Sequence, residues 1–454
     1  MADTVVRGGT VVTASGSSRA DVAVTGGRVS AIGPDLVDDA EIVDAAGLLV
    51  LPGIVDVHTH TRLPSAQEPQ RFVADSIAAA HGGTTTFLAF NNPGTGISDA
   101  GARRPLAGAT EFRARTAGQS VVDFGLSSVI GGHQDDPLAD LPELIASGVP
   151  TAKAFMVYDF RLGDEALERA LAIMARHAGM LQVHCEEPSV IEPLIAACLA
   201  RGEVGCRYHA LTRPPEAEAA ATRKAIEMAR RAEAPLYIVH LSCEGALQAV
   251  AEAKARGEPV YAETCPHYLT FTDDAYDDPD EAHVICRVIS PPLRARTDVD
   301  ALWAGLREGT IDVVASDHVP DRVAVEKRLP APPFPQISNG GPGIETLLSV
   351  TWSEGVAAGR ISPERLVDLL STTPARLFGL PSKGAIEVGR QADLVLFDPD
   401  ARRTLRQDDL HHTSDFTPFE GLAIRGGIVD VLVRGRRLAD AVGQPSGRFL
   451  ERHL

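Results

Sequence analysis

The chain has 454 residues, of which 44% are hydrophobic, and its 43 basic and 61 acidic side chains give a formal net charge of −18. A chain of this length buries a large core and divides into two or three domains, or into one large barrel with an accessory domain. The acidic balance, without a long basic run, excludes nucleic acid and anionic membranes as expected partners and predicts a soluble protein.

The cysteine pattern and the N-terminal residues both predict a cytoplasmic protein. The six cysteines are scattered without paired spacing, which argues against a disulfide framework and favours a reducing compartment. No hydrophobic run reaches the roughly 20 residues that a membrane span needs. The first residues also lack the basic and then hydrophobic pattern of a signal peptide.

The pattern of hydrophobic residues changes once along the chain, at Pro52. Before it, short strands separated by glycine-containing turns are expected at 4–6, 10–13, 21–25, 28–32 and 41–44. After it, hydrophobic strands alternate with helical segments. These strands are expected at 54–58, 84–90, 121–129, 151–157, 181–185, 236–241, 260–265 and 312–317.

The helical segments have clear start and stop signals. Helices are expected at 165–178 and 243–256, each followed by a glycine. In the first, Leu167, Leu171 and Met174 recur three or four residues apart, as a helix lying on a sheet requires. Eight hydrophobic strands alternating with helices predict an α/β protein with a parallel (β/α)8 TIM-like barrel.

The two ends of the chain share one pattern of short strands. Strands expected at 384–397 and 428–438 resemble the N-terminal ones, so both ends should pair into one small β-sandwich domain beside the barrel. Residues after Val442 are polar and are expected to form a surface arm or to reach a neighbouring subunit. The expected domains are 52–376 for the catalytic metal-dependent barrel, and 1–51 with 377–454, including the tail, for the small domain.

Potential metal ligands follow the barrel strands at the end where such barrels place their active sites. His58 and His60 lie two residues apart at the end of strand 54–58, so they project from the same face. A single histidine at a strand end is more often a hydrogen-bonded core residue than a ligand. Here, however, later strands end in further ligand types, namely Lys153, His184, His240 and Asp317. Six such side chains at one rim indicate a shared metal site.

Lys153 lies among hydrophobic residues, where a bare ammonium would carry a large desolvation cost. One alternative is a salt-bridged or snorkelling lysine. The other is an amine carboxylated by CO2, N6-carboxylysine, whose two oxygens can bridge two divalent ions. Zinc suits imidazole and carboxylate, although manganese, nickel, cobalt or iron can occupy such a site. The expected ligand sets are His58, His60 and Asp317 for one ion, and His184 with His240 for the other.

These residues resemble the amidohydrolase superfamily and, within it, the cyclic amidases called dihydropyrimidinases or hydantoinases. The resemblance covers nearly the whole chain. It rests on Pro-Gly-Ile-Val-Asp-Val-His-Thr-His at 52–60, Lys-Ala-Phe-Met-Val-Tyr at 153–158, His-Ala-Leu-Thr-Arg-Pro-Pro-Glu at 209–216, Glu-Thr-Cys-Pro-His-Tyr-Leu at 263–269, Ser-Pro-Pro-Leu-Arg at 290–294, Ser-Asp-His at 316–318, Asn-Gly-Gly-Pro-Gly-Ile-Glu at 339–345 and Asp-Phe-Thr-Pro-Phe-Glu-Gly at 415–421. It implies a hydrolase that opens cyclic amide or imide rings to N-carbamoyl amino acids.

The resemblance also implies roles for individual residues. The metals hold a bridging hydroxide, and Asp317 acts as the general base that passes a proton to the departing ring nitrogen. Tyr158 hydrogen-bonds the developing oxyanion, unless its ring only packs. Ser290 and Asn339 match positions where the family holds the ring amide through backbone groups. The candidates for the wall that faces the ring substituent, with plain core as the alternative, are Leu63, Phe155 and Phe160.

Arg62 and Asn92 depart from the hydantoinase pattern. They are similar to dihydroorotase, where an arginine and an asparagine hold the substrate carboxylate; the alternative for Arg62 is a solvated loop residue. Dihydroorotase and allantoinase therefore stay open as activities. A non-catalytic scaffold is a further alternative from another class, although the retained ligands and Tyr158 speak against it. The family resemblance implies a homodimer or homotetramer that acts on a small cyclic amide.

Overall fold

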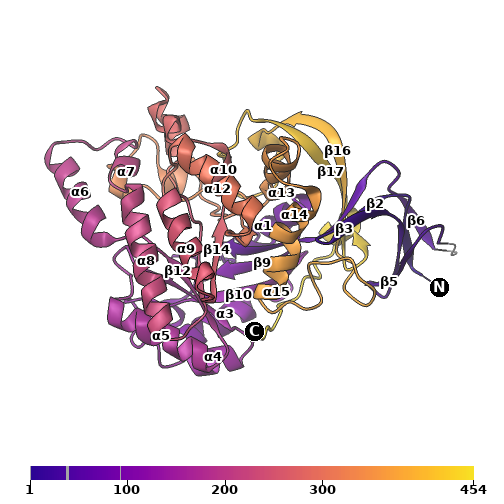
Figure 1. Ribbon diagram of the computed structural model, residues 1–454, viewed down its shortest axis with the longest axis horizontal. Coiled ribbons are helices and arrows are strands. Elements are labelled where there is room, and N and C mark those ends of the chain that lie inside the picture. The colour runs from indigo at the N-terminus through magenta and orange to yellow at the C-terminus, as the bar shows by residue number, and fades with distance from the viewer. Residues whose placement is uncertain (1, 37–39, 93) are drawn as a thin grey trace.

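The computed structural model describes residues 2–36, 40–92 and 94–454. Its centre is an eight-stranded parallel sheet whose strand order, from β8 to β15, follows the chain (Figure 1). The strands are β8 (Ile54–Thr59), β9 (Thr84–Phe90), β10 (Asp123–Val129), β11 (Thr151–Phe155), β12 (Met180–His184), β13 (Leu236–Ile238), β14 (Val260–Thr264) and β15 (Val313–Val314). A bridge between Thr59 and His318 joins the chain after the last strand to the first. The predicted (β/α)8 barrel is confirmed.

Helices cover the outside of this barrel (Figure 1). The longer ones are α1 (Arg71–His81), α3 (Pro105–Thr116), α5 (Asp164–Arg176), α6 (Pro188–Ala200), α8 (Pro215–Arg231), α9 (Glu244–Ala255) and α12 (Arg296–Glu308). The shorter ones are α2 (Asp99–Arg103), α4 (Leu141–Ala146), α7 (Tyr208–Leu211), α10 (Pro266–Thr270), α11 (Glu281–Ile285), α13 (Leu347–Thr351), α14 (Pro363–Val367), α15 (Thr373–Leu377) and α16 (Leu438–Val442). Helix α5 buries Leu167, Leu171 and Met174, as predicted. It ends before Ala178, whose φ of 55° leaves the helical region.

Two further sheets form a small β unit beside the barrel, at the right of Figure 1. One has the order β5-β4-β1-β6 and the other β18-β17-β16-β7-β2-β3. The strands are β1 (Thr4–Arg7), β2 (Thr10–Thr13), β3 (Gly16–Arg19), β4 (Asp21–Thr25), β5 (Arg28–Gly33), β6 (Glu41–Asp44), β7 (Leu49–Pro52), β16 (Leu394–Thr404), β17 (Ala423–Val433) and β18 (Arg436–Arg437). Antiparallel pairing of Leu394 with Pro52 joins the two ends of the chain, as predicted.

Some strand boundaries in this unit differ from the prediction. Strand β3 has the sequence Gly-Ser-Ser-Arg and is largely exposed, so it carries no hydrophobic signal and forms only because β2 pairs with it. Strand β7 was also missed. At the C-terminal end, the strand expected at 384–397 begins only at Leu394 and continues through polar residues to Thr404, because pairing with β17 extends that far.

The C-terminal tail lies along the surface of its own barrel, with Arg452 as its one buried side chain. An arm that reaches a neighbouring subunit stays a prediction. The amide of Leu450 donates to the carbonyl of Phe124 at 2.7 Å, and that of Arg452 to Gly148 at 2.9 Å. The buried guanidinium of Arg452 donates to the carbonyl of Phe378 at 3.2 Å and the hydroxyl of Thr151 at 2.8 Å. The tail therefore closes the barrel at the N-terminal ends of its strands.

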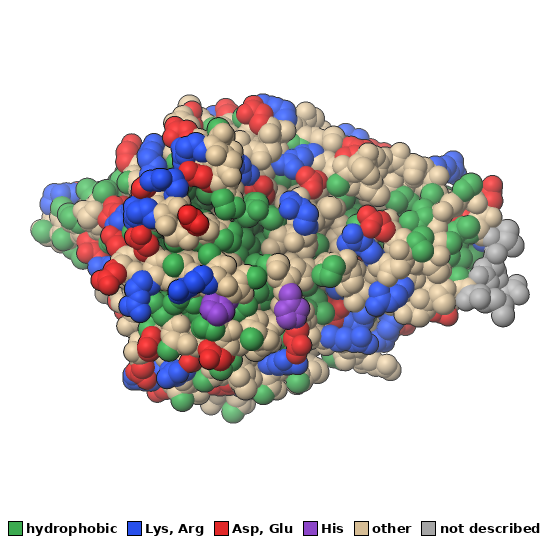
Figure 2. Space-filling view, turned by 60° about the horizontal axis from the view of Figure 1, so that its bottom comes forward, with side chains coloured by type: hydrophobic (Ala, Val, Ile, Leu, Met, Phe, Trp, Pro, Cys, Tyr) green, Lys and Arg blue, Asp and Glu red, His purple; other side chains and the backbone are tan. Residues whose placement is uncertain are grey.

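On the face drawn in Figure 2, acidic and basic side chains are interspersed, and hydrophobic side chains gather in a hollow near its middle. All six cysteines are free, and five of them are buried. Within the described residues, no helix combines the length and the hydropathy that crossing a bilayer requires.

Candidate metal centre and active site

The predicted site residues meet in one pocket at the C-terminal ends of the barrel strands. The pocket has a volume of about 270 Å³. It is lined by His60, Arg62, Asn92, Lys153, Phe155, Tyr158, Phe160, His184, His240, Ser290, Asp317, Val319, Ile337, Ser338 and Asn339. The set contains every predicted metal ligand and contact to the ring amide except His58, which is fully buried beside the pocket. Leu63, a candidate for the wall, is also outside the set. Segments that are far apart in the sequence thus converge as the barrel topology requires.

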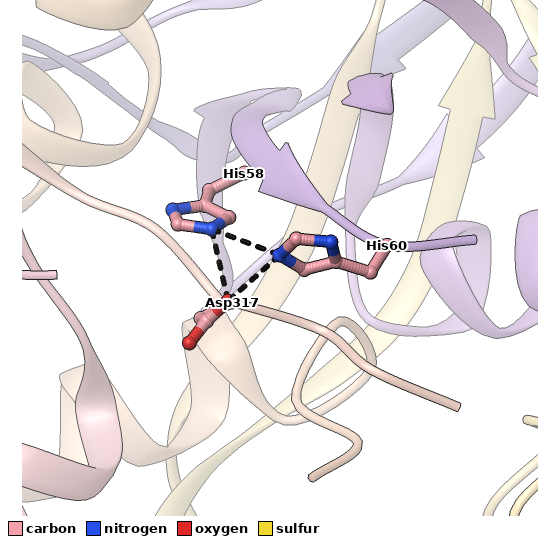
Figure 3. Close-up of side chains that lie close together, drawn as sticks. All are labelled: His58, His60 and Asp317. Atoms are coloured by element: carbon pink, nitrogen blue, oxygen red, sulfur yellow. Dashed lines mark hydrogen bonds and ion pairs between the residues drawn. The ribbon is translucent and has the colours of Figure 1, made fainter. Parts of the chain in front are cut away.

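His58, His60 and Asp317 form the tightest group in the pocket (Figure 3). Nε2 of His58 lies 2.9 Å from Oδ1 of Asp317, and Nε2 of His60 lies 3.4 Å from the same oxygen. The two Nε2 atoms are 3.2 Å apart. Two imidazole nitrogens and one carboxylate oxygen therefore face a common point, a donor set that suits a divalent transition metal.

The outward nitrogens of both imidazoles are held by other side chains. Nδ1 of His58 pairs with Glu263, whose other carboxylate oxygen accepts from the Tyr237 hydroxyl at 2.8 Å. Nδ1 of His60 pairs with the amide oxygen of Asn92 at 2.8 Å. Such partners fix the ring orientation of metal-binding histidines. Glu263 was not singled out as a site residue, although it belongs to a quoted motif at the end of β14.

Lys153 and His240 carry buried nitrogens that have no hydrogen-bond partner among the described residues. These are Nζ of Lys153 and Nδ1 of His240. Nζ lies 4.9 Å from the centroid of the Phe90 ring and 5.1 Å from that of Phe155. Unpaired buried polar atoms are costly. Their presence beside the group of His58 fits a site that holds further bound groups.

His184 lies against His240, with 4.5 Å between their ring centroids. Its Nε2 pairs with Glu186 at 2.6 Å, which leaves Nδ1 for a ligand. The same oxygen of Glu186 accepts from Arg213 at 2.5 Å. Arg213 and Glu186 were not predicted as site residues, although Arg213 lies in the quoted motif 209–216. Through Glu186, this motif holds the imidazole of His184 on the side away from the pocket.

Electrostatics favour the metal-binding forms of His60, His240 and Asp317. His58 differs, because burial lowers its pKa but the nearby Asp317 and Glu263 outweigh burial and raise it. Burial lowers the pKa of His60 to about 4 and that of His240 well below its ordinary value. Burial also disfavours charge on Asp317, but nearby His58 and hydrogen bonds hold its pKa well below the usual range. Neutral imidazoles and an ionised carboxylate are the ligand forms. Burial lowers the pKa of Lys153 to about 8, so this amine loses its proton more easily than an exposed lysine.

Three pocket residues have backbone conformations that non-glycine residues rarely adopt. The φ angles are 75° for Tyr158, 38° for His240 and 49° for Asp317. Each such conformation costs on the order of 1–3 kcal/mol and persists only where the surrounding structure enforces it. All three are residues to which the sequence assigned a role in the chemistry, although other described residues outside the pocket, among them Ala178 and Arg434, also have positive φ angles.

The opposite wall of the pocket is formed by Tyr158 and its neighbours. Burial raises the pKa of Tyr158, and the side chains of Ser290 and Asn339 lie beside its hydroxyl. The phenol therefore stays protonated and can donate a hydrogen bond. The ring stacks on Phe160 at 5.5 Å between centroids, and the Arg213 guanidinium lies 5.2 Å from the ring centroid.

The expected substrate-facing residues differ in where their side chains lie. Phe155 and Phe160 line the pocket, whereas Leu63 packs into the barrel core, which was the alternative left open for it. Arg62 pairs with the fully buried Asp321 at 3.0 Å. Its guanidinium is therefore already engaged by a carboxylate of the same chain, and it is not a solvated loop residue.

A parallel barrel whose rim gathers these histidines, a buried lysine and an aspartate is the architecture of a metal-dependent hydrolase. The model of the amidohydrolase family matches residues 49–438, and the chain belongs to this family. Within it, the chain belongs to the hydantoinases and dihydropyrimidinases.

The relatives support this placement over the whole length of the chain. The chain is 38% identical to a D-hydantoinase of Geobacillus stearothermophilus, over 98% of this chain and 96% of the relative. It is 37% identical to a D-hydantoinase of Ralstonia pickettii, over 99% of both. Among solved structures, a D-hydantoinase from Bacillus sp. AR9 superposes with a TM-score of 0.92 at 40% identity, over 99% of both chains. A dihydropyrimidinase from Brevibacillus agri has a TM-score of 0.91 at 39% identity, over 99% of this chain and 98% of that one.

Proposed function

We propose that this protein hydrolyses the ring of 5-substituted hydantoins and dihydropyrimidines to N-carbamoyl amino acids. The observation that carries the proposal is the meeting of the His58, His60 and Asp317 group with Tyr158 in one pocket. This pocket lies in a chain that is similar over its full length to proteins named D-hydantoinase and dihydropyrimidinase. In this proposal the barrel, 52–376, carries the chemistry, and 1–51 with 377–454 form the small domain.

We propose two divalent ions, zinc being the first candidate, as the cofactors. Bound there, such ions lower the pKa of water towards neutrality and polarise the ring carbonyl. His58, His60 and Asp317 would hold one ion, and His184 with His240 the other. This assignment is supported by the donor set and by the unpaired Nδ1 of His240.

The proposed bridging group is Lys153 carboxylated on Nζ. Because burial brings its pKa to about 8, a fraction of the amine is neutral near pH 7, and the neutral amine adds to CO2. The N–C bond forms, one proton leaves, and the product is an anionic carbamate. The carbamate would take the place of a buried ammonium that has no hydrogen-bond partner among the described residues, and two bound divalent ions would offset its negative charge.

The side chains have distinct tasks in the hydrolysis. As water adds to the ring carbonyl carbon, Asp317 accepts its proton and delivers it to the ring nitrogen, so the C–N bond breaks and this nitrogen becomes the NH2 of the carbamoyl group in the product. The Tyr158 hydroxyl donates to the oxygen that gains charge. Ser290 and Asn339, beside that hydroxyl, hold the ring amide through backbone groups.

The pocket favours a hydrophobic ring substituent over a carboxylate. The two residues that resemble a carboxylate site are engaged within the chain, Arg62 by Asp321 and Asn92 by His60. The wall beside them is formed by Phe155, Phe160, Val319 and Ile337. We therefore propose a hydantoinase rather than a dihydroorotase or allantoinase activity.

A panel assay tests the proposal. Metal-replete protein is given 5-phenylhydantoin, dihydrouracil, dihydroorotate and allantoin, and we expect the highest kcat/KM on one of the first two. A preference for dihydroorotate that Arg62→Ala abolishes would replace the proposal with the dihydroorotase activity. Absence of turnover on all four substrates, at full metal content, would favour a non-catalytic scaffold.

The assembly and location proposed are a homodimer or homotetramer in the cytoplasm. The assembly rests on the family resemblance, and the location rests on the six free cysteines, which suit a reducing compartment. Light scattering coupled to gel filtration measures the mass in solution, and a monomeric mass would contradict the proposed assembly.

A further inference from the structure

We propose that Lys327 is a positioning residue that fixes the two loops expected to hold the ring amide, 288–290 and 338–341, relative to each other. Its Nζ donates to the carbonyl of Val288 at 3.0 Å and to that of Ser338 at 3.1 Å. The first carbonyl lies two residues before Ser290 and the second one residue before Asn339. The inference rests on the proposed function, because that function assigns substrate contacts to these two loops.

The surroundings of Lys327 indicate that its hydrogen bonds are the reason for a lysine at this position. The side chain is completely buried, and the described residues place no carboxylate within ion-pair distance of it. Its Nζ lies 5.5 Å from the centroid of the Phe416 ring, a weak cation–π partner. A hydrophobic side chain would avoid the desolvation cost of a buried ammonium. The two carbonyl contacts are what such a replacement would lose.

Lys327 is itself held from the other side. It is the last residue of the short π-helix η2 (Val323–Lys327). The amide of Val323 donates to Asp415 at 2.6 Å, and Glu326 pairs with Arg322 at 3.0 Å and with Arg71 of α1 at 3.3 Å. The lysine therefore lies on a segment, η2, that is held in place by α1 of the barrel wall and by the motif 415–421.

The motif 415–421 contacts both Lys327 and the 338–341 loop. Phe416 lies beside the Lys327 ammonium. Pro418 packs closely on Gly341, because a Cβ added to Gly341 would lie only 2.9 Å from Cγ of Pro418. The amide of Gly340 donates to the Val288 carbonyl at 3.1 Å, so this carbonyl receives both a backbone and a side-chain donor. The motif thus supports the 338–341 loop from outside the pocket, and Lys327 joins it to the 288–290 loop.

A change in the spacing of these loops acts on substrate binding more than on the metal ligands. Ser290 and Asn339 lie on the two loops and beside the Tyr158 hydroxyl, whereas the proposed metal ligands follow the barrel strands. Contacts to the ring amide hold the bound substrate and the transition state alike, so weakening them raises KM more than it lowers kcat. We therefore expect loss of Lys327 to raise KM, with metal content unchanged.

The test compares Lys327→Met with Lys383→Met in the metal-replete enzyme. Lys383 is a matched control, because it is equally buried but pairs with Asp123 and Asp393, each at 2.7 Å, away from the pocket. For Lys327→Met we expect kcat/KM on 5-phenylhydantoin to fall by about 10- to 100-fold, mainly through KM. The ratio of kcat/KM for 5-phenylhydantoin to that for dihydrouracil should also change, because the two rings differ in size. Lys383→Met should lower Tm and leave KM and this ratio unchanged.

Two further variants keep the inference testable. Lys327→Gln retains N–H donors without the charge, and we expect it to recover part of the KM lost in Lys327→Met. If Lys327→Met does not fold, Asp415→Ala is used instead. This variant frees the Val323 amide, so the segment that carries Lys327 is less firmly held and KM should also rise. An unchanged KM, or a fall in activity that only follows metal loss, overturns the inference. If the wild-type enzyme opens no cyclic amide, the proposed function fails instead.

Discussion

The two ends of the barrel hold buried lysines in opposite ways. At the N-terminal end, Lys383 is paired with Asp123 and Asp393. At the rim, Lys153 is buried just as completely, and its Nζ has no partner among the described residues. The lysine at the N-terminal end is satisfied by two carboxylates, whereas the lysine at the rim has an unpaired amine and shares its pocket with Tyr158, His240 and Asp317, whose backbone is strained. In barrels of this type the first arrangement serves stability and the second serves chemistry.

Replacement of Lys153 tests this contrast most severely. For Lys153→Ala we expect a sharp fall in bound metal and a fall in activity of more than about 100-fold. Loss of a residue that only hydrogen-bonds a metal ligand already lowers metal affinity or activity by about 10–100-fold. Metal content by elemental analysis and kcat are measured together. Lys383→Met is the control and should keep its metal. Unchanged metal occupancy in Lys153→Ala would remove the bridging role.

Tyr158→Phe separates hydrogen bonding to the substrate from metal binding. The variant keeps the ring stacked on Phe160 and loses only the hydroxyl. We expect kcat to fall by about 10²–10³-fold, as for loss of one donor to a developing oxyanion, with metal content unchanged. A kcat close to that of the wild type would mean that the ring packs without a catalytic role.

Glu263→Gln tests the partner behind His58. The carboxylate of Glu263 contacts Nδ1 of His58 and the Tyr237 hydroxyl, so it orients the imidazole and increases its basicity. We expect metal affinity to fall by about 10–100-fold, measured by competition with a chelator of known affinity. Equal affinity in variant and wild type would show that backbone geometry alone positions His58.

The sequence located the rim because hydrophobic runs define where strands end, and parallel strands bring those ends together. The alternation that placed His58 and His60 on one face needs no knowledge of tertiary contacts. The position of Arg452 does need it, since its partners, Phe378 and Thr151, are distant in the sequence and the tail itself is polar.

Arg62 shows a further limit of local pattern. Its motif resembles a carboxylate-binding site, but its partner in this chain is Asp321, which lies 259 residues away. Glu263 was missed for a related reason. A carboxylate in a buried strand indicates a partner, but only the closed barrel shows that this partner is His58. Residues that line the pocket were thus easier to predict than the residues that hold them in place.

The smallest effect on catalysis, and a large one on stability, is expected at the N-terminal end. Lys383→Met leaves Asp123 buried with one partner fewer. We expect the free energy of unfolding to fall by about 3–5 kcal/mol, measured by urea unfolding in chelator so that metal does not contribute, while kcat/KM of the metal-replete variant is unchanged.

The loss of unfolding free energy in Lys383→Met should depend on pH through the carboxylate of Asp123. Burial disfavours charge on Asp123, but Lys383 and Arg434 outweigh it and lower its pKa below the ordinary 3.8. Its ionisation therefore contributes stability above that pH and loses this contribution as the pH falls below it. The difference between wild type and Lys383→Met should be largest near neutral pH and narrow in acid. A difference that stays constant down to acid pH would mean that Lys383 stabilises the barrel by packing, and the contrast between the two ends would then rest on Lys153 alone.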